Sequence, residues 1–424
     1  MNKKISRLRG MYDVLPDESW IWQRIEHIVE ETFQSYSYQQ IRFPIVEKTQ
    51  LFHTTIGEAT DVVEKEMFSF QSRSGNSISL RPEGTAGCVR AVIQNQLCNR
   101  GATQKLWYIG PMFRYERPQK GRNRQFTQIG AEYFNVESAH ADAELILMTA
   151  RLWKNLGLPN IQLEINSLGT SQSRKAYREV LIAYFQQHNE LLDEDAQRRL
   201  LTNPLRILDS KNPNMKEMIN NAPLLSDYLD DESKEHFQQL KSILDACKIS
   251  YKINPKLVRG LDYYSKTVFE WITTDLGSQG TICGGGRYDS LVELQGGKPT
   301  PAVGFAMGVD RIVEIIKDLK LWQNNNESKT YLIVDKEVAM ETAYELSEKI
   351  HQALPQLKLF MNQNPTSFKA QFKKADKMGA QFAIIVGEEE AKSRKITLKY
   401  LWNKEIGQQS FEFAEFVNFM NKQQ

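Results

Sequence analysis

The sequence predicts an α+β protein in which an antiparallel sheet flanked by helices is interrupted by a helical insertion and followed by a small α/β domain. Three observations predict this architecture. The first half contains long strand-like runs with few helices between them, a pattern that favours antiparallel over βαβ pairing. Residues 171–250 are polar, rich in Leu and Gln, and nearly all helix-like. Residues 330–424 alternate strand-like and helix-like segments, which is typical of α/β folds.

Length and composition narrow the class of protein. The 424 residues suffice for two or three domains, and 41% hydrophobic with 25% charged residues is the balance of a soluble globular chain. No apolar run approaches the roughly 20 residues of a membrane helix, and the basic amino terminus lacks the apolar stretch of a signal peptide. The four cysteines contain no CxxC pair, which fits a reducing compartment. We therefore expect a cytoplasmic protein without a membrane partner.

The sheet domain is expected over residues 1–170 and again over 253–322. Its opening helix is predicted at 18–36, where apolar side chains recur at i, i+4, i+7 and i+8. Further helices are predicted at 84–98 and 309–320. Strands are predicted at 41–46, 77–81, 105–116, 126–136, 267–272, 281–283 and 302–307.

Two more domains complete the chain. Residues 171–252 are expected to form the helical insertion, since three prolines divide this segment into short helices. The polar stretch 323–329 has the composition of a linker, and residues 330–424 are expected to form an α/β domain on a largely buried sheet. Its strands are predicted at 330–335, 357–361, 382–387 and 395–401. Eight of its 13 basic residues form two clusters: Lys369, Lys373, Lys374 and Lys377, then Lys392, Arg394, Lys395 and Lys399.

The densest positive patch of the sequence lies within residues 110–126. From 114 to 124 there are five cations and one anion, although the net charge of the chain is only +2. A strand places Arg114 and Glu116 on one face, and an arginine held by a strand suits bidentate phosphate contact. The loop that follows suits a longer polyanion such as a nucleic-acid end. The alternative is a solvated hairpin tip, but Arg and Glu alternate where apolar residues are expected, which favours function.

Other candidate residues lie further along the chain. Arg259 precedes Tyr263 and Tyr264, which would point to opposite faces of a strand, one lining a pocket and one packed in the core. Packing alone explains the two tyrosines equally well, and surface exposure is the alternative for Arg259. The glycines at 284–286 are expected to leave a strand and open a helix; they form neither a GxGxxG fingerprint nor a P-loop. Arg311 falls in the first turn of a helix, where the dipole disfavours a cation, so either an anionic ligand or surface exposure explains it.

Three polar residues, Glu83, Gln128 and Glu132, lie on or beside strands with apolar neighbours. Together they could hold an amino group and a polar side chain, whereas each alone could be a surface residue or a helix cap. The six histidines show no HxxxH or HExxH spacing, which argues against histidine-based metal chemistry. No GxSxG motif occurs, and no Ser/His/Asp order is persuasive.

Together these residues resemble a known class of enzyme. FRYER at 113–117 with RNRQF at 122–126 resembles motif 2 of class II aminoacyl-tRNA synthetases, and GFAMGVDR at 304–311 resembles motif 3. The proline-bearing segment IRFPIV at 41–46, which follows the first helix, resembles motif 1, the dimer-forming element of that class.

Further peptides narrow the resemblance to one family. LVRGLDYY at 257–264 and GGGRYD at 284–289 are similar to two peptides peculiar to histidyl-tRNA synthetases, and RGMYDVLP at 9–16 resembles their amino-terminal segment. The resemblance spans nearly the whole chain. It implies a six-stranded antiparallel catalytic sheet and a two-step reaction: histidine and ATP give histidyl-adenylate and pyrophosphate, and the histidyl group then passes to the 3′ end of tRNA(His).

The resemblance also implies roles for individual residues. Arg114 and Arg259 would be catalytic, gripping the α-phosphate from two sides, with Arg259 standing where other class II enzymes hold a metal ion. The resemblance implies ATP binding by Arg114, Glu116, Arg122, Phe126 and Arg311. It implies histidine binding by Glu83, Gly84, Thr85, Arg114, Gln128, Glu132, Arg259, Tyr263 and Tyr264. It implies contact with the tRNA acceptor end by Arg117, Gln119 and Arg124.

The implied partners are L-histidine, ATP with Mg²⁺, tRNA(His) and a second copy of the chain. The Mg²⁺ ligands are not identified by the sequence, and no zinc is expected. Residues 330–424 would bind the anticodon, with the two basic clusters as candidates and a merely solvated face as the equal alternative.

Three other functions compete with this interpretation. Regulatory proteins of histidine biosynthesis share the catalytic fold, but they typically lack the carboxy-terminal domain and several active-site residues that this sequence has. Synthetases for proline or threonine are disfavoured by the two histidine-specific peptides. A non-enzymatic RNA-binding protein would not need arginines at three places suited to ATP.

Overall fold

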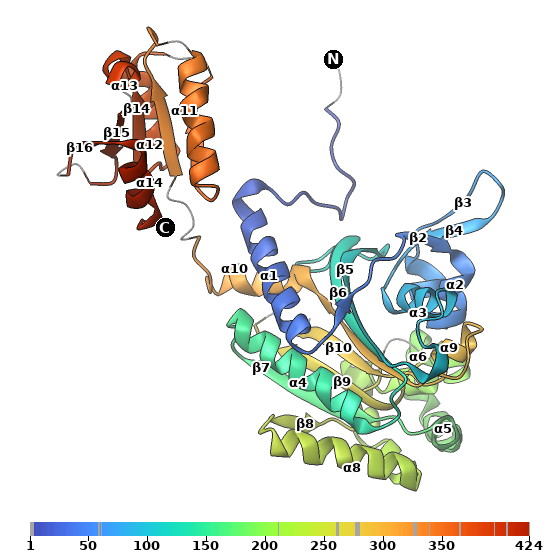
Figure 1. The fold of residues 1–424 in the computed structure, drawn as a ribbon. Coiled ribbons are helices and arrows are strands. Elements are labelled where there is room, and N and C mark those ends of the chain that lie inside the picture. Colours follow the sequence, from blue (N-terminus) through green and yellow to red (C-terminus); the bar gives the residue numbers. More distant parts are fainter. Residues whose placement is uncertain are drawn as a thin grey trace. The chain divides into compact units, whose positions relative to one another are not determined.

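A computed structural model of the chain describes residues 4–57, 60, 62–210, 212–259, 263–275, 280–324, 329–338, 340–363, 366–393, 395–403 and 406–423. The chain divides into two compact units, Met1–Trp322 and Gln323–Gln424 (Figure 1). Helices and sheets are mixed in both, so the prediction of an α+β fold is confirmed. None of the described helices offers an apolar stretch of the length that a bilayer crossing requires. The exact domain boundaries remain predictions.

The first unit is built on a sheet of eight strands among the described residues. Their order is β1 (Gln39–Gln40), β5 (Gln104–Phe113), β6 (Gln125–Phe134), β11 (Ala302–Gly308), β10 (Thr281–Arg287), β9 (Ser265–Thr273), β7 (Ile161–Ser167) and β8 (Tyr251–Ile253). The six central strands, β5 to β7 in this order, pair antiparallel. The edge strands β1 and β8 pair parallel with their neighbours. The implied six-stranded antiparallel sheet is therefore present, with one short parallel strand added at each edge.

The strand predicted at 41–46 is wrong. Residues 41–45 lie outside the strands, between β1 and β2 (Val46–Lys48). Pro44 has no N–H to donate to a ladder. The carbonyl of Phe43 is bound instead by the Arg81 guanidinium, with Nη1 at 3.0 Å, while Arg81 Nε donates to the carbonyl of Pro111 at 2.9 Å.

The predicted place of the three glycines is also wrong, because residues 284–286 lie inside β10 and do not open a helix. A Cβ at Gly285 would come within 2.6 Å of Phe305 Cβ on the adjacent strand. The glycines therefore permit close approach inside the sheet. The helix that follows, α9 (Leu291–Leu294), is a single turn.

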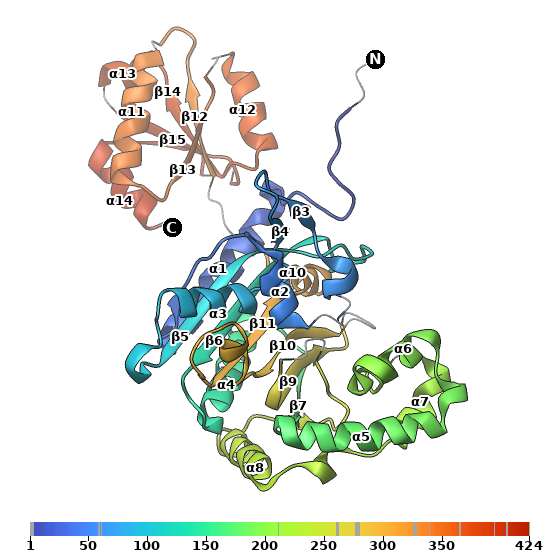
Figure 2. The same ribbon diagram turned by 90° about the vertical axis from the view of Figure 1, so that its right-hand side faces the viewer.

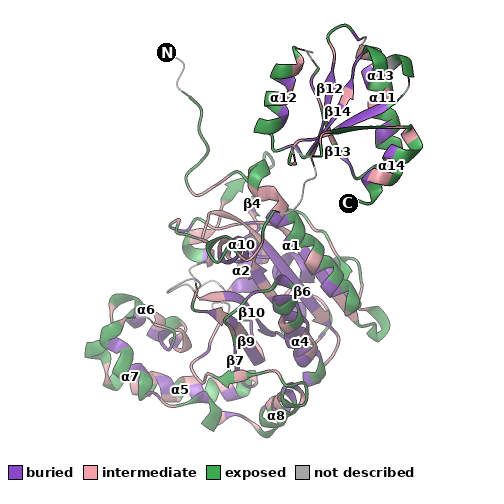
Figure 3. Cartoon of the chain, turned by 90° about the vertical axis from the view of Figure 1, so that its left-hand side faces the viewer, coloured by how far each residue is buried: buried purple, intermediate pink, exposed green. Residues whose placement is uncertain are grey.

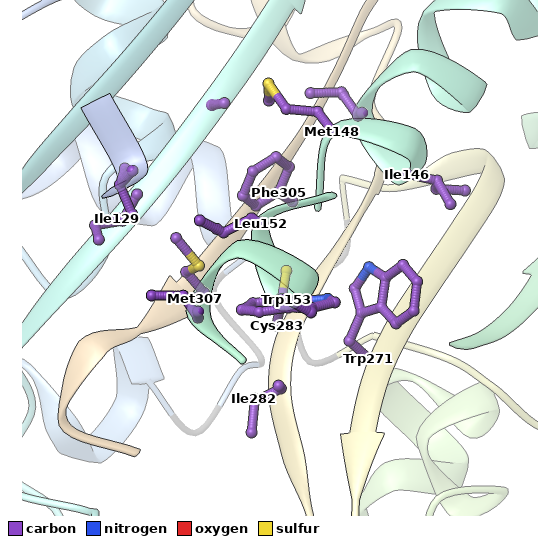
Figure 4. Close-up of a cluster of buried hydrophobic side chains, with 14 of the residues drawn as sticks. Ile129, Ile146, Met148, Leu152, Trp153, Trp271, Ile282, Cys283, Phe305 and Met307 are labelled. Carbon is purple, nitrogen blue, oxygen red and sulfur yellow. The ribbon is translucent and has the colours of Figure 1, made fainter. Parts of the chain in front are cut away.

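One face of the sheet is covered by α1 (Pro16–Ser35), α4 (Ala139–Leu156) and α10 (Val309–Asp318) (Figure 1). Apolar residues of α4, including Leu152 and Trp153, pack on alternate residues of the strands (Figure 4). The side chains from this face, among them Ile129 and Met307, are fully or almost fully buried. Helix α4 was not predicted as a separate element, nor were β7 and β8.

The opposite face carries α2 (Thr49–Ile56), α3 (Thr85–Gln94), α9 and a small sheet of β2, β4 (Ser77–Leu80) and β3 (Ser69–Gln71). The insertion is helical, as predicted, and is set to one side of the sheet in Figure 2. Its helices are α5 (Ser171–Gln187), α6 (Glu194–Thr202), α7 (Lys216–Asn220) and α8 (Asp231–Ala246). Short helical turns lie at Val62–Glu66, Asn99–Gly101, Asn189–Leu191, Pro204–Ile207, Pro213–Met215 and Leu225–Tyr228.

The second unit is an α/β domain, as predicted. Its sheet has the order β13 (Lys358–Met361), β12 (Lys329–Val334), β14 (Phe382–Val386), β15 (Ile396–Tyr400) and β16 (Gln408–Phe411), and its helices are α11 (Met340–Ala353), α12 (Phe368–Lys377), α13 (Glu388–Ser393) and α14 (Phe413–Asn421). The buried strands and exposed helix faces are visible in Figure 3. The first basic cluster lies on α12; Arg394 of the second lies outside the described residues.

Candidate active site

The site lies on the sheet face opposite α1 and α4. On β6, Ile129 turns to the α4 side (Figure 4), so its neighbour Gln128 turns to the other face. Gln128 and Glu132 are paired across the ladder with Gly308 and Gly304 of β11. The Glu132 carboxylate fills the space above Gly304, whereas the space above Gly308, beside Gln128, is open and belongs to a pocket.

Most of the residues predicted for substrate binding line this one pocket. They are Glu83, Thr85, Arg114, Glu116, Arg122, Phe126, Gln128, Arg259, Tyr263, Tyr264 and Arg311. Gly84 lies at its edge and donates its backbone N–H to Gln128 Oε1 at 3.0 Å. Glu132 is fully buried beneath the pocket. Residues separated by more than 200 positions in the sequence, such as Glu83 and Arg311, are thus brought together by the sheet.

The loop between β5 and β6 forms one wall. Arg114 Nε donates to the carbonyl of Pro82 at 2.8 Å, and its guanidinium lies 5.3 Å from the centre of the Phe126 ring. The Glu116 carboxylate, 3.9 Å from Arg114, forms a close ion pair with Arg122. Arg117 and Gln119 are exposed outside the pocket. Arg124 is half-buried and stacks on Tyr115 at 3.7 Å from its centre.

Arg311 completes the cationic end of the pocket. Its guanidinium donates to the carbonyl of Thr281 on β10. Burial and the nearby charge of Arg122 lower the pKa of Arg311, because both disfavour its charged form. Several arginines that repel one another in one pocket are the arrangement expected for a polyanionic ligand.

Arg259 approaches from the other side and forms an ion pair with Glu270 of β9. Burial alone would lower the pKa of Arg259, but the carboxylate of Glu270 outweighs it and raises the pKa. Glu270 also accepts a hydrogen bond from Thr281 Oγ1 at 3.0 Å. A Cβ on Gly284 would lie 2.5 Å from the Arg259 guanidinium. The glycine strand therefore makes the space in which Arg259 lies.

Glu83 has both of the roles that its sequence context left open, helix cap and pocket residue. The carboxylate of Glu83 accepts the backbone N–H groups of Thr85 and Ala86 at 2.7 and 2.8 Å, so it caps the start of α3 while lining the pocket. Burial raises the pKa of Glu83.

Tyr263 and Tyr264 both line the pocket, with ring centres 4.6 Å apart. The prediction that one of them lies in the core and the other in the pocket is therefore wrong. The reason is that Tyr263 lies in a turn and Tyr264 precedes β9.

The polar centre beneath the pocket is Glu132. Its Oε1 accepts hydrogen bonds from Thr85 Oγ1 at 2.8 Å and from the Tyr108 hydroxyl at 3.0 Å, and its Oε2 accepts one from the Tyr288 hydroxyl. Complete burial raises the pKa of Glu132 to about 8, and the three hydroxyl donors oppose but do not cancel this effect. The raised pKa favours the protonated carboxyl group near neutral pH.

Residues 10–312 match the family model described as histidyl-tRNA synthetase. The chain belongs to the histidyl-tRNA synthetase family. Residues 327–423 match a second family model, described as an anticodon binding domain. The two matches together cover both compact units.

Individual synthetases of this family support the assignment. The curated histidine–tRNA ligase of Hydrogenovibrio crunogenus is 54% identical over 401 residues, which are 95% of this chain and 94% of that protein. The crystal structure of apo S. aureus histidyl-tRNA synthetase is 33% identical, has a TM-score of 0.82, and is matched over 98% of this chain and 99% of that chain. An ATP phosphoribosyltransferase regulatory subunit/histidyl-tRNA synthetase from Bacillus halodurans is 22% identical with a TM-score of 0.63 over 88% and 97% of the two chains. That last likeness shows the fold alone.

Sequence reasoning missed four residues of this synthetase site: Tyr108, Glu270, Tyr288 and Asp310. Two of them bind Glu132, one binds Arg259, and Asp310 lines the pocket. Tyr288 belongs to the GGGRYD peptide and could have been chosen from it. Neither Tyr108 nor Glu270 has a signal in the sequence, because each is defined by a partner on a distant strand.

Proposed function

We propose that the chain activates L-histidine with ATP to form histidyl-adenylate and pyrophosphate, and then transfers the histidyl group to the 3′ end of tRNA(His). The observation that carries this proposal is the pairing of an arginine-lined pocket with a buried, proton-holding carboxyl at its base. The arginine-lined pocket suits a triphosphate, and the buried carboxyl group suits an imidazole. Membership of the histidyl-tRNA synthetase family agrees with both.

The nucleotide is proposed to bind along the β5–β6 loop and α10. Phe126 would stack on the adenine ring, and Glu116 would accept a hydrogen bond from the adenine amino group. Arg122 and Arg311 would hold the β- and γ-phosphates. Glu116 and Arg122 form an ion pair with each other, so ATP binding exchanges that pair for two contacts with the nucleotide. Because charge-assisted hydrogen bonds are replaced by others of the same kind, the exchange costs little.

Chemistry is proposed to occur between Arg114 and Arg259. The histidine carboxylate attacks the α-phosphorus, a new P–O bond forms, and the bond to the pyrophosphate oxygen breaks. Negative charge accumulates on the α-phosphate oxygens, where two fixed guanidinium groups stabilise it. Such stabilisation by one donor is worth about 100- to 1000-fold in rate.

Histidine is proposed to be selected by hydrogen bonding rather than by size. Glu83, Thr85 and Gln128, with the adjoining backbone of Gly84, surround the place of the α-amino group. Glu132, with Tyr263 and Tyr264, would hydrogen-bond the imidazole. An amino acid without ring nitrogens leaves the buried carboxyl without a partner, which a site of this kind rejects strongly.

Mg²⁺ is proposed to arrive with the ATP phosphates. Among the described residues, no group of three or more His, Cys, Asp and Glu side chains is placed to hold a metal ion. Magnesium typically uses one or two carboxylates together with substrate phosphates. It would neutralise phosphate charge when bound, and the expectation that no zinc is needed stays a prediction.

The remaining partners are also part of the proposal. Arg117, Gln119 and Arg124 would contact the acceptor end of tRNA(His), and residues 330–424 would bind its anticodon. A homodimer through the segment around 41–46 is supported by the exposure of Ile45 and Val46, which are 41% and 40% accessible. Cytoplasmic action follows from the location of tRNA charging.

The test is ATP–pyrophosphate exchange by the purified full chain, run separately with each of the twenty amino acids. We expect exchange with histidine alone, followed by charging of tRNA(His). No exchange with any amino acid, from folded protein, would favour a regulatory binding subunit. Exchange with another amino acid would support an aminoacyl-tRNA synthetase but refute the proposed histidine specificity of the pocket.

A further inference from the structure

The amino-terminal segment RGMYDVLP at 9–16 has no part in the site described so far, yet it is docked on the wall of the nucleotide pocket. The backbone N–H of Arg124 donates to the carbonyl of Gly10 at 2.7 Å. Gly10 has φ +83°, and a Cβ there would lie 2.8 Å from Arg124 Cγ and 2.9 Å from Pro118 Cγ. A residue with a side chain is thus disfavoured at Gly10 both by its backbone conformation and by the loop against it.

Two residues further on, Tyr12 contacts Asp310, which also binds the β5–β6 loop. Its hydroxyl donates to Asp310 Oδ1 at 2.6 Å, and its ring packs against Trp22 of α1 with centres 6.2 Å apart. Burial and the Asp310 carboxylate both raise the pKa of Tyr12. The hydroxyl therefore remains a proton donor over the whole working range of pH.

Asp310 is the point at which three segments meet. Besides Tyr12, its carboxylate accepts Asn123 Nδ2 of the β5–β6 loop at 3.3 Å and the backbone N–H of Thr127 on β6 at 2.9 Å. Asp310 is 5% exposed. It immediately precedes Arg311 in the first turn of α10, and both Asn123 and Asp310 line the nucleotide pocket.

We propose that Tyr12 is a positioning residue for the nucleotide: by holding the Asp310 carboxylate it fixes the β5–β6 loop against the start of α10. This inference rests on the proposed function, since it concerns how the ATP pocket is kept in shape. Tyr12 is absent from the residues that line the pocket, so it acts through Asp310 and does not touch ATP. The histidine end of the pocket, around Glu132, has no contact with Tyr12 among those the structure shows.

A purely structural tether predicts a different result from a positioning residue. If Tyr12 only anchored the chain end, its loss would lower thermal stability and leave substrate affinities unchanged. If it positions the loop, its loss weakens ATP binding selectively. The hydroxyl alone can be removed by Tyr12→Phe, which keeps the ring on Trp22.

The experiment compares the wild-type full chain, Tyr12→Phe and the control Tyr184→Phe. Tyr184 donates a similar hydrogen bond to the carbonyl of Met218 at 2.8 Å, but within the helical insertion. We measure Mg·ATP binding by calorimetry, the KM values for ATP and histidine in pyrophosphate exchange, and amide hydrogen exchange at Thr127. For Tyr12→Phe we expect ATP affinity to weaken about five- to tenfold, the upper part of the range for the loss of one ordinary hydrogen bond, with unchanged KM for histidine and faster exchange at Thr127.

Three results decide the inference. The inference is supported if ATP binding is selectively weaker in Tyr12→Phe and unchanged in Tyr184→Phe. Unchanged ATP affinity overturns it, and so does an equal rise of both KM values accompanied by a lower melting temperature. If wild-type protein shows no histidine-dependent exchange, the proposed function fails, while ATP binding and the Thr127 amide still decide the role of Tyr12.

Discussion

The close approach of Gly284 to Arg259 offers a way to move the arginine proposed to be catalytic without removing it. A Cβ at Gly284 would lie 2.5 Å from three guanidinium atoms of Arg259. Non-bonded heavy atoms prefer about 3.5 to 4.0 Å, so Gly284→Ala has to displace the guanidinium by about 1 Å. Gly284 lies in β10 without a positive φ, so its backbone accepts alanine.

A displacement of this size is large on the scale of catalysis. Misplacement of a catalytic group by about 1 Å can cost about 100-fold in rate, which corresponds to about 2.7 kcal/mol of activation free energy. Stability should change little, because the atoms that must move are the end of a flexible side chain. We therefore expect histidine-dependent exchange by Gly284→Ala to fall about 100-fold while its melting temperature stays within a few degrees of wild type.

A double-mutant cycle separates this cause from a direct clash with substrate. Arg259→Ala alone is expected to nearly abolish adenylate formation while leaving the protein folded, and Arg259→His should do the same. If Gly284→Ala acts through Arg259, adding it to Arg259→Ala costs little more, because the group it displaces is already absent. Additive losses in the double variant, or normal activity of Gly284→Ala, would refute the role given to Arg259.

Two further predictions concern the ends of the site. Glu132→Gln should lower kcat/KM for histidine about 2- to 10-fold, as for a lost hydrogen bond between neutral groups, with KM for ATP as the comparison. The pKa of Glu132 in the folded chain, about 8, lies above the usual glutamate value of about 4.5. The stability of the wild type therefore falls as the pH rises from about 4.5 through 8. Melting temperatures of the variant should lack this pH dependence, and the same dependence in both proteins would contradict the assignment. Arg117→Ala should raise KM for tRNA(His) several-fold and reduce the salt dependence of charging by about one phosphate contact; an unchanged salt slope would contradict contact with the acceptor end.

Arg114 and Glu116 could be predicted from the alternation expected along a strand, although the strand predicted at 105–116 is too long: β5 ends at Phe113, and both residues lie on the loop that follows. Arg114 and Glu116 interrupt an apolar pattern at a spacing of two, which is a local signal that needs no knowledge of the fold. Both line the pocket. Glu83 was the opposite case, since a carboxylate before a helix predicts a cap and a pocket residue equally well, and the structure shows both.

The sequence could not reveal contacts between residues on distant segments, such as a side chain that lies against a glycine of another strand. Three glycines in a row indicate close approach, but only the sheet shows that Gly284 makes room for Arg259. Likewise Glu270 reads as an ordinary strand residue until β9 places it against Arg259. The failed strand at 41–46 has the same origin, because a distant arginine, Arg81, takes the carbonyl that a ladder would have used.

Arg114 and Arg259, the two arginines proposed to be catalytic, and Arg122 of the loop are all held by carboxylates or carbonyls of the protein. Arg122 is paired with Glu116 and Arg259 with Glu270. The Arg259 side chain is 20% exposed and the Arg122 side chain 38%, so the cost of several kcal/mol for a buried charge without a partner applies to Arg259. Glu270 lies on β9, whereas Arg259 lies in the segment between β8 and β9, and Arg122 lies on the β5–β6 loop. Under the proposed function, the Arg259–Glu270 pair holds an arginine at the reacting phosphate, and the Arg122–Glu116 pair exchanges its partners when the phosphates bind. The Tyr12–Asp310 contact holds Asn123, the neighbour of Arg122 on that loop, and so belongs to the second of these two parts.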